Sequence, residues 1–279
     1  TLWSMQQLAN SYESVGRHDE ALKLREQTLA AKKRVLPPDH PDMLFSSQNL
    51  AASYEAVGRY SEALKLDEET LAACKRVFAA DHPVTLACMW GIADCLVKLD
   101  RGTEAVPIID ECLALAAGKP VNPRMIPEMM DLRLRHFQKA SDPAGCRTTA
   151  AMWEKLDRHD AASLYNAACF RAVTAAVQAK AGGADAQRLA REDADKAMQW
   201  LTGAAGAGWH DPAQMEKDAD LDPLRERADF RKLLAALDTE VNENVAATRQ
   251  SFRREPDKPS EGTTQPTAVS SPDARASPP

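Results

Sequence analysis

The chain has 279 residues and a formal net charge of -6; apolar residues make up 44% of it and aromatic residues only 5%. A chain of this length exceeds one ordinary globular core, so either two domains or an array of repeats is expected. The acidic balance argues against broad nucleic-acid binding, which needs a basic face. No stretch reaches the roughly 20 apolar residues that a membrane-spanning helix requires, and the first residues lack a secretory signal pattern.

A period of 42 residues organises the first part of the chain. Residues 1–42 and residues 43–84 share about two-thirds of their aligned positions, which chance does not supply at a fixed offset. Leu2, Leu44 and Leu86 take equivalent places in three successive copies. The third copy, residues 85–126, keeps mainly the apolar frame: Leu86, Ile92, Ala93, Leu96, Leu99, Ala105, Ile108 and Leu113.

Each copy is predicted to fold into two helices. The Asp-His-Pro sequences that end at Pro41 and Pro83 place proline in the first turn of a helix, where no N–H partner is needed. Apolar residues then recur at helical spacing until Gly58 ends the first helix of the second copy. A second helix follows and ends near Val77. One such pair cannot bury its apolar faces alone, so neighbouring pairs are expected to stack.

The second copy carries the motif Leu50-Ala51-x-x-Tyr54-x-x-x-Gly58-Arg59-Tyr60-x-Glu62-Ala63-Leu64, followed by Asp81-His82-Pro83. This motif resembles the tetratricopeptide repeat in its long, kinesin-light-chain-like form. The resemblance implies an all-α fold, a right-handed α-solenoid of helix pairs, with three repeats over residues 1–126. In the third repeat Asp100 replaces the glycine and Leu96 the tyrosine. Aspartate tolerates left-handed geometry, so the turn is still expected there.

The second half of the chain follows a different pattern. Residues 127–160 are interpreted as a degenerate fourth helix pair, and residues 161–240 as a divergent repeat with a C-terminal helical cap. The words YNAAC, DLDPLR and DFRKLL in this stretch resemble the element that closes repeat arrays in some bacterial serine/threonine protein kinases. Residues 245–279 are rich in Pro and Ser and are predicted to be disordered. Thr1 enters midway through a repeat, so an upstream region is expected.

One stripe on the first helix of each repeat is the candidate site. In the tetratricopeptide family this stripe lines the concave surface that receives peptides, and Asn49 matches a family asparagine that contacts the ligand backbone. The stripe comprises Trp3, Gln6, Asn10 and Glu13; Phe45, Gln48, Ala52 and Glu55; and Ala87, Trp90, Asp94 and Val97. Glu13, Glu55 and Asp94 are expected to favour a neutral or basic partner, partly offset by Lys98. The alternative is that Trp3 and Trp90 belong to the core between repeats and the polar residues are only solvated.

Other chemistries are weaker in this sequence. The glycines from Gly203 to Gly208 lack the strand and the Lys-Ser or Lys-Thr of a phosphate loop, so they are interpreted as a helix end. Asp218, Asp220 and Asp222 are spaced like the start of a calcium loop, but Pro223 stands where glycine is needed, which favours a turn. His40 and His82 recur with the repeat and so indicate architecture. No catalytic residue, metal or cofactor is predicted.

The sequence therefore predicts a non-catalytic scaffold that binds a protein or peptide partner in its concave groove. The resemblance implies that this scaffold is the regulatory C-terminal part of a bacterial serine/threonine kinase. The alternative is a structural module that associates with itself. Six cysteines without close pairs are expected to be buried thiols, which indicates a reducing, cytoplasmic compartment. Ser271 and Ser277, each followed by proline, are candidate phosphorylation sites, with a plain solvated tail as the alternative.

Overall fold

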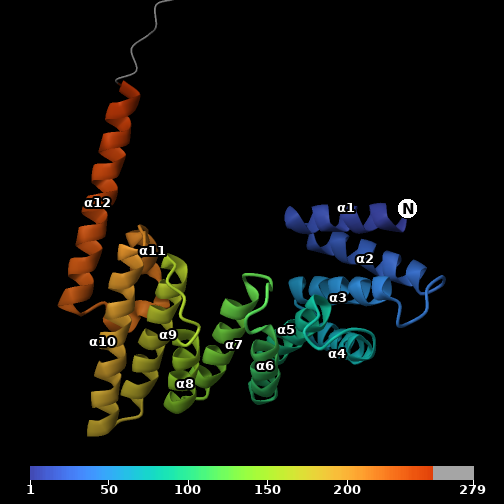
Figure 1. The fold of residues 1–279 in the computed structure, drawn as a ribbon, viewed down its shortest axis with the longest axis horizontal. Coiled ribbons are helices and arrows are strands. Elements are labelled where there is room, and N and C mark those ends of the chain that lie inside the picture. The colour runs from blue at the N-terminus through green and yellow to red at the C-terminus, as the bar shows by residue number, and fades with distance from the viewer. Residues whose placement is uncertain (254–279) are drawn as a thin grey trace, which may run out of the picture. The chain divides into compact units, whose positions relative to one another are not determined.

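The computed structural model describes residues 1–253, and of residues 242 and 244–253 only the backbone. The chain divides into two compact units, Thr1–Leu237 and Asp238–Pro279. Every regular element in the described range is a helix, and most follow one another as antiparallel pairs (Figure 1). The elements are α1 (Leu2–Ser14), α2 (His18–Lys32), α3 (Pro41–Ala56), α4 (Tyr60–Val77), α5 (Pro83–Lys98), α6 (Gly102–Ala116), α7 (Met125–Lys139), α8 (Pro143–Glu154), α9 (Ala161–Lys180), α10 (Ala184–Gly206), α11 (Pro212–Lys217), the 3-10 helix η1 (Ala219–Leu224) and α12 (Ala228–Arg253).

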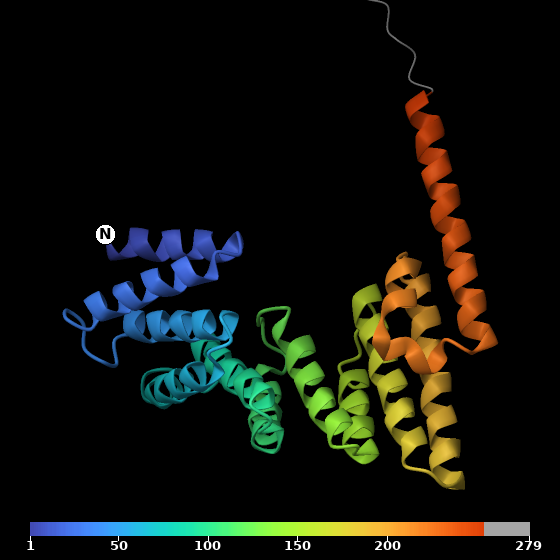
Figure 2. The same ribbon diagram turned by 180° about the vertical axis from the view of Figure 1, so that it is seen from behind.

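The 42-residue period is preserved in the packing of the first three helix pairs. Ala9, Ala51 and Ala93 stand at equivalent places in α1, α3 and α5, and all three are fully buried. Small residues at these places let neighbouring helices approach closely. Leu44 and Leu86 are also buried, whereas Leu2 in the first turn of α1 is only partly covered. The successive pairs lie side by side in both views, which confirms the predicted solenoid of helix pairs (Figures 1 and 2).

The turn inside each pair has the same left-handed backbone conformation. Gly16 and Gly58 adopt φ angles of 76° and 77°, which glycine takes without steric cost. Asp100 adopts φ of 61° at the equivalent place of the third repeat. The prediction that aspartate supports this turn is therefore confirmed.

The duplicated histidines begin the first helices of the second and third repeats. His40 Nδ1 accepts a hydrogen bond of 3.1 Å from the backbone N–H of Asp42, and His82 Nδ1 accepts one of 3.3 Å from Val84. Each ring thus satisfies a backbone donor that the helix leaves unpaired, and the proline that follows each histidine needs no such partner. The duplication reflects helix capping, as the sequence indicated.

A separate core closes the C-terminal end of the first unit. Helices α9 and α10 pack against each other, and α11, η1 and the first turns of α12 cover them. Leu221 and Leu224 of η1 are fully buried, and Phe230 and Leu237 of α12 are almost so. This arrangement supplies the cover that the last helix pair of a solenoid needs.

A buried guanidinium ties three helices together in this region. Arg171 of α9 is 3% exposed and contacts Glu154 of α8 at 2.6 Å and Asp193 of α10 at 2.8 Å. Trp200 Nε1 donates a hydrogen bond of 3.0 Å to the same Glu154 carboxylate. The charge of Arg171 is fully compensated, which is the condition for burying it without a large penalty.

Helix α12 runs further than the sequence predicted. Its backbone is helical to Arg253, whereas the disordered tail was expected to begin at residue 245. The physical reason is that neither glycine nor proline interrupts the chain between Leu237 and Pro256, and alanine and arginine favour helix. The rest of the expected tail, with Ser271 and Ser277, lies outside the described residues. Within residues 1–253, no helix is long and apolar enough to span a bilayer.

Candidate functional site

The candidate site lies where the first helices of successive repeats meet. Helices α3, α5 and α7 contact one another in that order. A pocket of about 260 Å³ opens between them. Its walls are Gln48, Ala52 and Glu55 of α3; Ala87, Trp90, Gly91 and Asp94 of α5; and Glu128 of α7. Six of these eight residues belong to the stripe that the sequence singled out.

The stripe residues of the first repeat do not line this pocket. The side chain of Trp3 on α1 is 72% exposed, so Trp3 is not part of a core between repeats. Phe45, 47% exposed, lies at the N-terminal end of α3, with its ring edge-on to His82. Trp90 is half-buried and packs on the central apolar cluster while also lining the pocket. Trp90 therefore fits both interpretations, because it packs in the core and also lines the groove.

Asn49 and Lys98 also lie outside the pocket walls. The backbone carbonyl of Asn49 accepts a hydrogen bond of 3.0 Å from Arg25. Lys98 is exposed in the last turn of α5, and its positive charge lowers the pKa of Asp94, whereas burial raises it. Burial is the larger effect, so the pKa of Asp94 is raised above its ordinary value. Lys98 therefore reduces the rise in the pKa of Asp94 without cancelling it.

Two carboxyl groups in and behind the pocket resist ionisation. Burial raises the pKa of Glu55 to about 7, and the negative charge of Asp94 adds to this rise. The Cys95 thiol donates a hydrogen bond of 3.4 Å to Glu55, which lowers the pKa but does not cancel the rise. Asp67 of α4 is only 1% exposed, and burial together with the nearby Glu55 raises its pKa well above the ordinary value. Asp67 Oδ1 is buried without a hydrogen-bond partner. Neither carboxyl group has a cationic partner among the described residues, so ionising the pair would leave its negative charge uncompensated.

Gly91 lies against both of these carboxyl groups. A Cβ atom at this position would stand 2.2 Å from Asp67 Oδ2 and 2.8 Å from Glu55 Oε1. Both distances are shorter than any ordinary contact, so only glycine lets α5 approach α4 and the two carboxyl groups this closely. The bare backbone of Gly91 leaves Asp67 directly behind the pocket wall.

The equivalent place between the first two repeats is built differently. Arg25 of α2 occupies the position that Asp67 occupies one repeat later, and it is 8% exposed. Its guanidinium contacts the Glu13 carboxylate at 3.2 Å and donates to Asn10 Oδ1 at 3.2 Å and to Ser53 Oγ. Glu13 also lies 2.9 Å from the His18 ring. The expectation that Glu13 adds free negative charge to the groove is therefore wrong, because Arg25 neutralises it.

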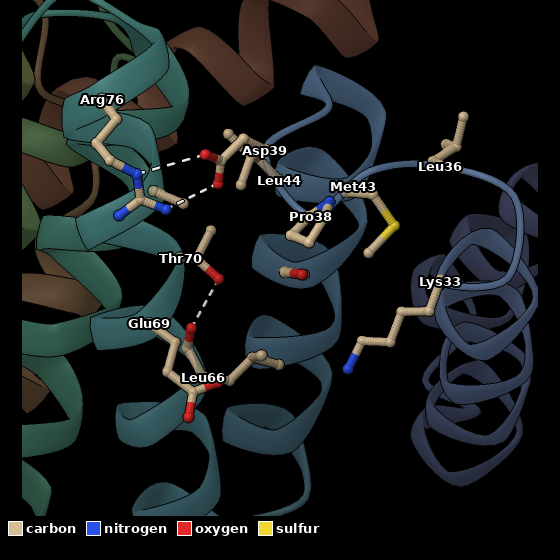
Figure 3. A pocket seen from close by; sticks show the side chains of 12 residues that line it. Lys33, Leu36, Pro38, Asp39, Met43, Leu44, Leu66, Glu69, Thr70 and Arg76 are labelled. Atoms are coloured by element: carbon tan, nitrogen blue, oxygen red, sulfur yellow. Dashed lines mark hydrogen bonds and ion pairs between the residues drawn. The ribbon is translucent and has the colours of Figure 1, made fainter.

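A second pocket, of about 440 Å³, lies between the α2–α3 loop, α3 and α4 (Figure 3). Its apolar surface comes from Leu36, Met43, Leu44 and Leu66, and the Arg76–Asp39 ion pair, at 2.7 Å, borders it. Figure 3 shows Lys33 on the opposite side of the opening from this ion pair. The sequence analysis did not predict this pocket, because it depends on how the α2–α3 loop folds over the junction.

The aspartates near η1 do not form a calcium loop. Cys169, Asp218 and Asp220 bring ligand atoms within 4.8 Å of one another, but each aspartate already has partners. Asp220 pairs with Arg135 and Asp218 accepts a hydrogen bond of 2.7 Å from Tyr165. Asp218 also caps η1 through the backbone N–H of Asp220 at 3.0 Å. This agrees with the predicted turn, as the end of α10 at Gly206 agrees with the helix end predicted for the glycine run.

The family model for the tetratricopeptide repeat matches residues 1–76 and again residues 43–117. Residues 1–117 are tetratricopeptide repeats. A solved structure of a Podosopora anserina protein, described as kinesin light chain with nearly identical TPR-like repeats, aligns with a TM-score of 0.55. It is 22% identical, and the alignment covers 78% of this chain and 97% of that one. A point variant of the same protein aligns equally well, over 77% and 95%. No curated protein sequence matches at a significant level.

Three residues of the site were missed by the sequence analysis. Gly91 and Glu128 line the pocket, and Asp67 lies behind it. For Asp67 a signal was present in the aligned repeats, where a positive residue in the first copy is replaced by a negative one in the second. For Glu128 there was none, because α7 lies beyond the clear repeats.

Proposed function

We propose that residues 1–253 act as a scaffold that recruits a protein partner by holding a peptide segment in the groove formed by α3, α5 and α7. The observation that carries this proposal is the pocket between these helices, whose walls combine the Trp90 ring with amide and carboxyl side chains. An aromatic surface beside polar groups suits a segment held by an apolar anchor and polar contacts. The tetratricopeptide repeats of residues 1–117 support the same conclusion.

The experiment compares the same alanine-to-leucine substitution at two positions, one in the pocket wall on α3 and one outside the pocket on α4. Ala52→Leu adds bulk to a pocket wall, whereas Ala72→Leu adds the same bulk to an exposed place on α4. A pull-down with the full chain as bait is expected to lose its specific partners with Ala52→Leu and keep them with Ala72→Leu. Equal recovery with both variants would refute the groove assignment. Asn49→Ala and Trp90→Ala extend the comparison to the remaining sequence-predicted positions.

Self-association is the competing outcome, and sedimentation separates it from recruitment. We expect the chain to sediment as a monomer at micromolar concentration and to capture peptides in that state. A concentration-dependent dimer that captures none would favour the structural module instead. No catalytic step is assigned to residues 1–253 in this proposal.

The cellular setting of the scaffold is a further part of the proposal. The C-terminal words YNAAC, DLDPLR and DFRKLL support a place behind a bacterial serine/threonine kinase domain, by resemblance alone. The six buried free cysteines support a reducing, cytoplasmic compartment. The reading frame upstream of Thr1 tests the first statement, because a kinase domain encoded there is the expected result.

A further inference from the structure

The junction between the second and third repeats lacks the positive charge that the preceding junction contains. Between α1 and α3, Arg25 compensates Glu13 from inside the protein. Between α3 and α5, the equivalent position holds Asp67, and Glu55 stands where Glu13 stands. No ion pair joins Glu55, Asp67 or Asp94 to a cation among the described residues. The same kind of site therefore carries up to three acidic groups and no guanidinium of its own.

We propose that the pocket between α3 and α5 binds a lysine or arginine side chain of the partner, which supplies the positive charge that Arg25 supplies in the preceding junction. This inference rests on the proposed recruitment function and names the chemistry of the recruited segment. Glu55 and Asp94 line the pocket as counter-charges for the incoming cation. The carboxyl group of Asp67, buried and with one oxygen unpartnered, lies behind Gly91, where an incoming cation would favour its ionised form.

The other walls of the pocket are compatible with a cation. The Trp90 ring lines the same space, and aromatic faces attract ammonium and guanidinium groups. Gln48 offers an amide oxygen that accepts a hydrogen bond. Two cations near the pocket would repel an incoming basic side chain. Lys98 is an exposed residue of α5, and Arg124 forms an ion pair of 2.8 Å with Glu128. Neither cation reaches Glu55 or Asp67 in the structure.

An acidic partner is excluded by the same geometry. A carboxylate entering the pocket would meet Glu55 and Asp94 at close range without a cation from the walls, and like charges at such range repel strongly. An apolar side chain would cover the carboxyl groups and leave them without water or a counter-charge. A basic side chain is the one class that relieves the uncompensated charge instead of increasing its cost.

The test is a selection of random dodecapeptides, displayed on phage, against the immobilised full chain. The expected result is enrichment of peptides that share a lysine or arginine at one fixed position. The best peptide is then synthesised in two forms, one with that basic residue and one with citrulline for arginine or acetyl-lysine for lysine. We expect the neutral form to bind roughly tenfold more weakly.

Two variants of the protein locate the effect. The double change Glu55→Gln and Asp94→Asn keeps the shape of the walls and removes their charge, so the basic peptide is expected to lose roughly tenfold in affinity and the neutral form to lose little. The control Glu68→Gln, on the exposed face of α4, removes charge outside the pocket and is expected to bind as the original does. Circular dichroism checks that all the variants are folded.

The failures are distinguishable. Enriched peptides with acidic or apolar consensus residues would overturn the basic-residue inference and leave peptide recruitment standing. A basic consensus whose binding is unchanged by the double variant would overturn the assignment to this pocket. Selection of no peptide at all would overturn the recruitment function, and this inference with it.

Discussion

The junctions on either side of α3 have equivalent sequence positions and opposite electrostatics. On one side Arg25 reaches from α2 between the helices and contacts Glu13, Asn10 and Ser53. On the other side Asp67 occupies the same place and crowds Glu55 across Gly91. Two repeats that share about two-thirds of their aligned positions thus build a closed, neutral junction and a junction whose acid groups have no cationic partner among the described residues. The difference shows that one exchange at a buried position can convert a structural contact into a binding site.

The largest expected effect comes from removing the internal cation. Arg25→Met leaves the Glu13 carboxylate and the polar groups of Asn10 and Ser53 without their partner, because breaking a buried ion pair strands the remaining charge. We expect unfolding stability to fall by about 3 kcal/mol. Chemical denaturation monitored by circular dichroism measures it. Arg76→Met, which removes an exposed ion pair with Asp39, is the control and should change stability little. Equal effects of the two substitutions would contradict the compensated junction.

The next effect tests the close approach at the other junction. Gly91→Ala places a methyl group against Asp67 Oδ2 and Glu55 Oε1, so either these two carboxyl groups or α5 must shift. We expect a loss of about 2 kcal/mol, typical of overpacking. Gly203→Ala serves as control, since the nearest atom to its Cβ would be Leu164 Cδ1 at 3.8 Å. That helical position should gain about 0.5 kcal/mol from helix propensity. A tolerated Gly91→Ala would show that the two carboxyl groups lie further from α5.

Neutralising the buried Asp67 carboxyl group should stabilise the protein, in contrast to the two preceding substitutions. Asp67→Asn keeps the side-chain shape and removes a charge that has no counter-ion, so stability at pH 8 is expected to rise by about 1 kcal/mol. At pH 5 the gain should be smaller than at pH 8, because the pKa of Asp67 is raised and protonation removes its charge as the pH falls. Thermal melting at the two pH values measures both. Destabilisation at pH 8 would mean that Asp67 has a cationic partner.

The last prediction concerns the pH dependence of stability that Glu55 confers. Its pKa rises from an ordinary value near 4.5 to about 7, so the folded chain holds this proton more tightly than the unfolded chain does. The stability that results is complete below pH 4.5 and is lost as the pH rises through 7. Glu55→Gln should therefore flatten the fall in melting temperature between pH 5 and pH 8. Other carboxyl groups, such as Asp39 beside Arg76, have lowered pKa values and act in the opposite direction, so the variant must be compared with the original at each pH. An unchanged slope would contradict the burial of Glu55.

Much of the fold could be predicted from residues alone. The 42-residue offset placed Ala51 and Ala93 at equivalent buried positions, and the left-handed turns at Gly58 and Asp100 followed from local backbone preferences. The extent of α12 could not be predicted as well, because composition near residue 245 indicates low apolar content while local helix propensity continues to Arg253. Local helix propensity therefore determined the backbone conformation up to Arg253, against the expectation from composition.

The candidate site was predicted only in part. Gln48, Glu55, Trp90 and Asp94 were identified by helical spacing and do line one pocket. Glu13 had the same spacing but a different role, because a residue twelve positions later on another helix neutralises it. Helical periodicity reports which face a side chain occupies and does not report its partners on other helices.

The sequence by itself determined the repeat, its helix pairs, their turns and caps, and the stripe of side chains on the first helices, since each depends on residues close together along the chain. Only the tertiary structure decided which acid groups are paired, how closely α5 approaches α4 at Gly91, and where the stripe opens into a pocket. Those features depend on distances between helices, and charge interactions change steeply with distance and with exclusion of water. Identical spacing in two repeats can therefore end in opposite chemistry.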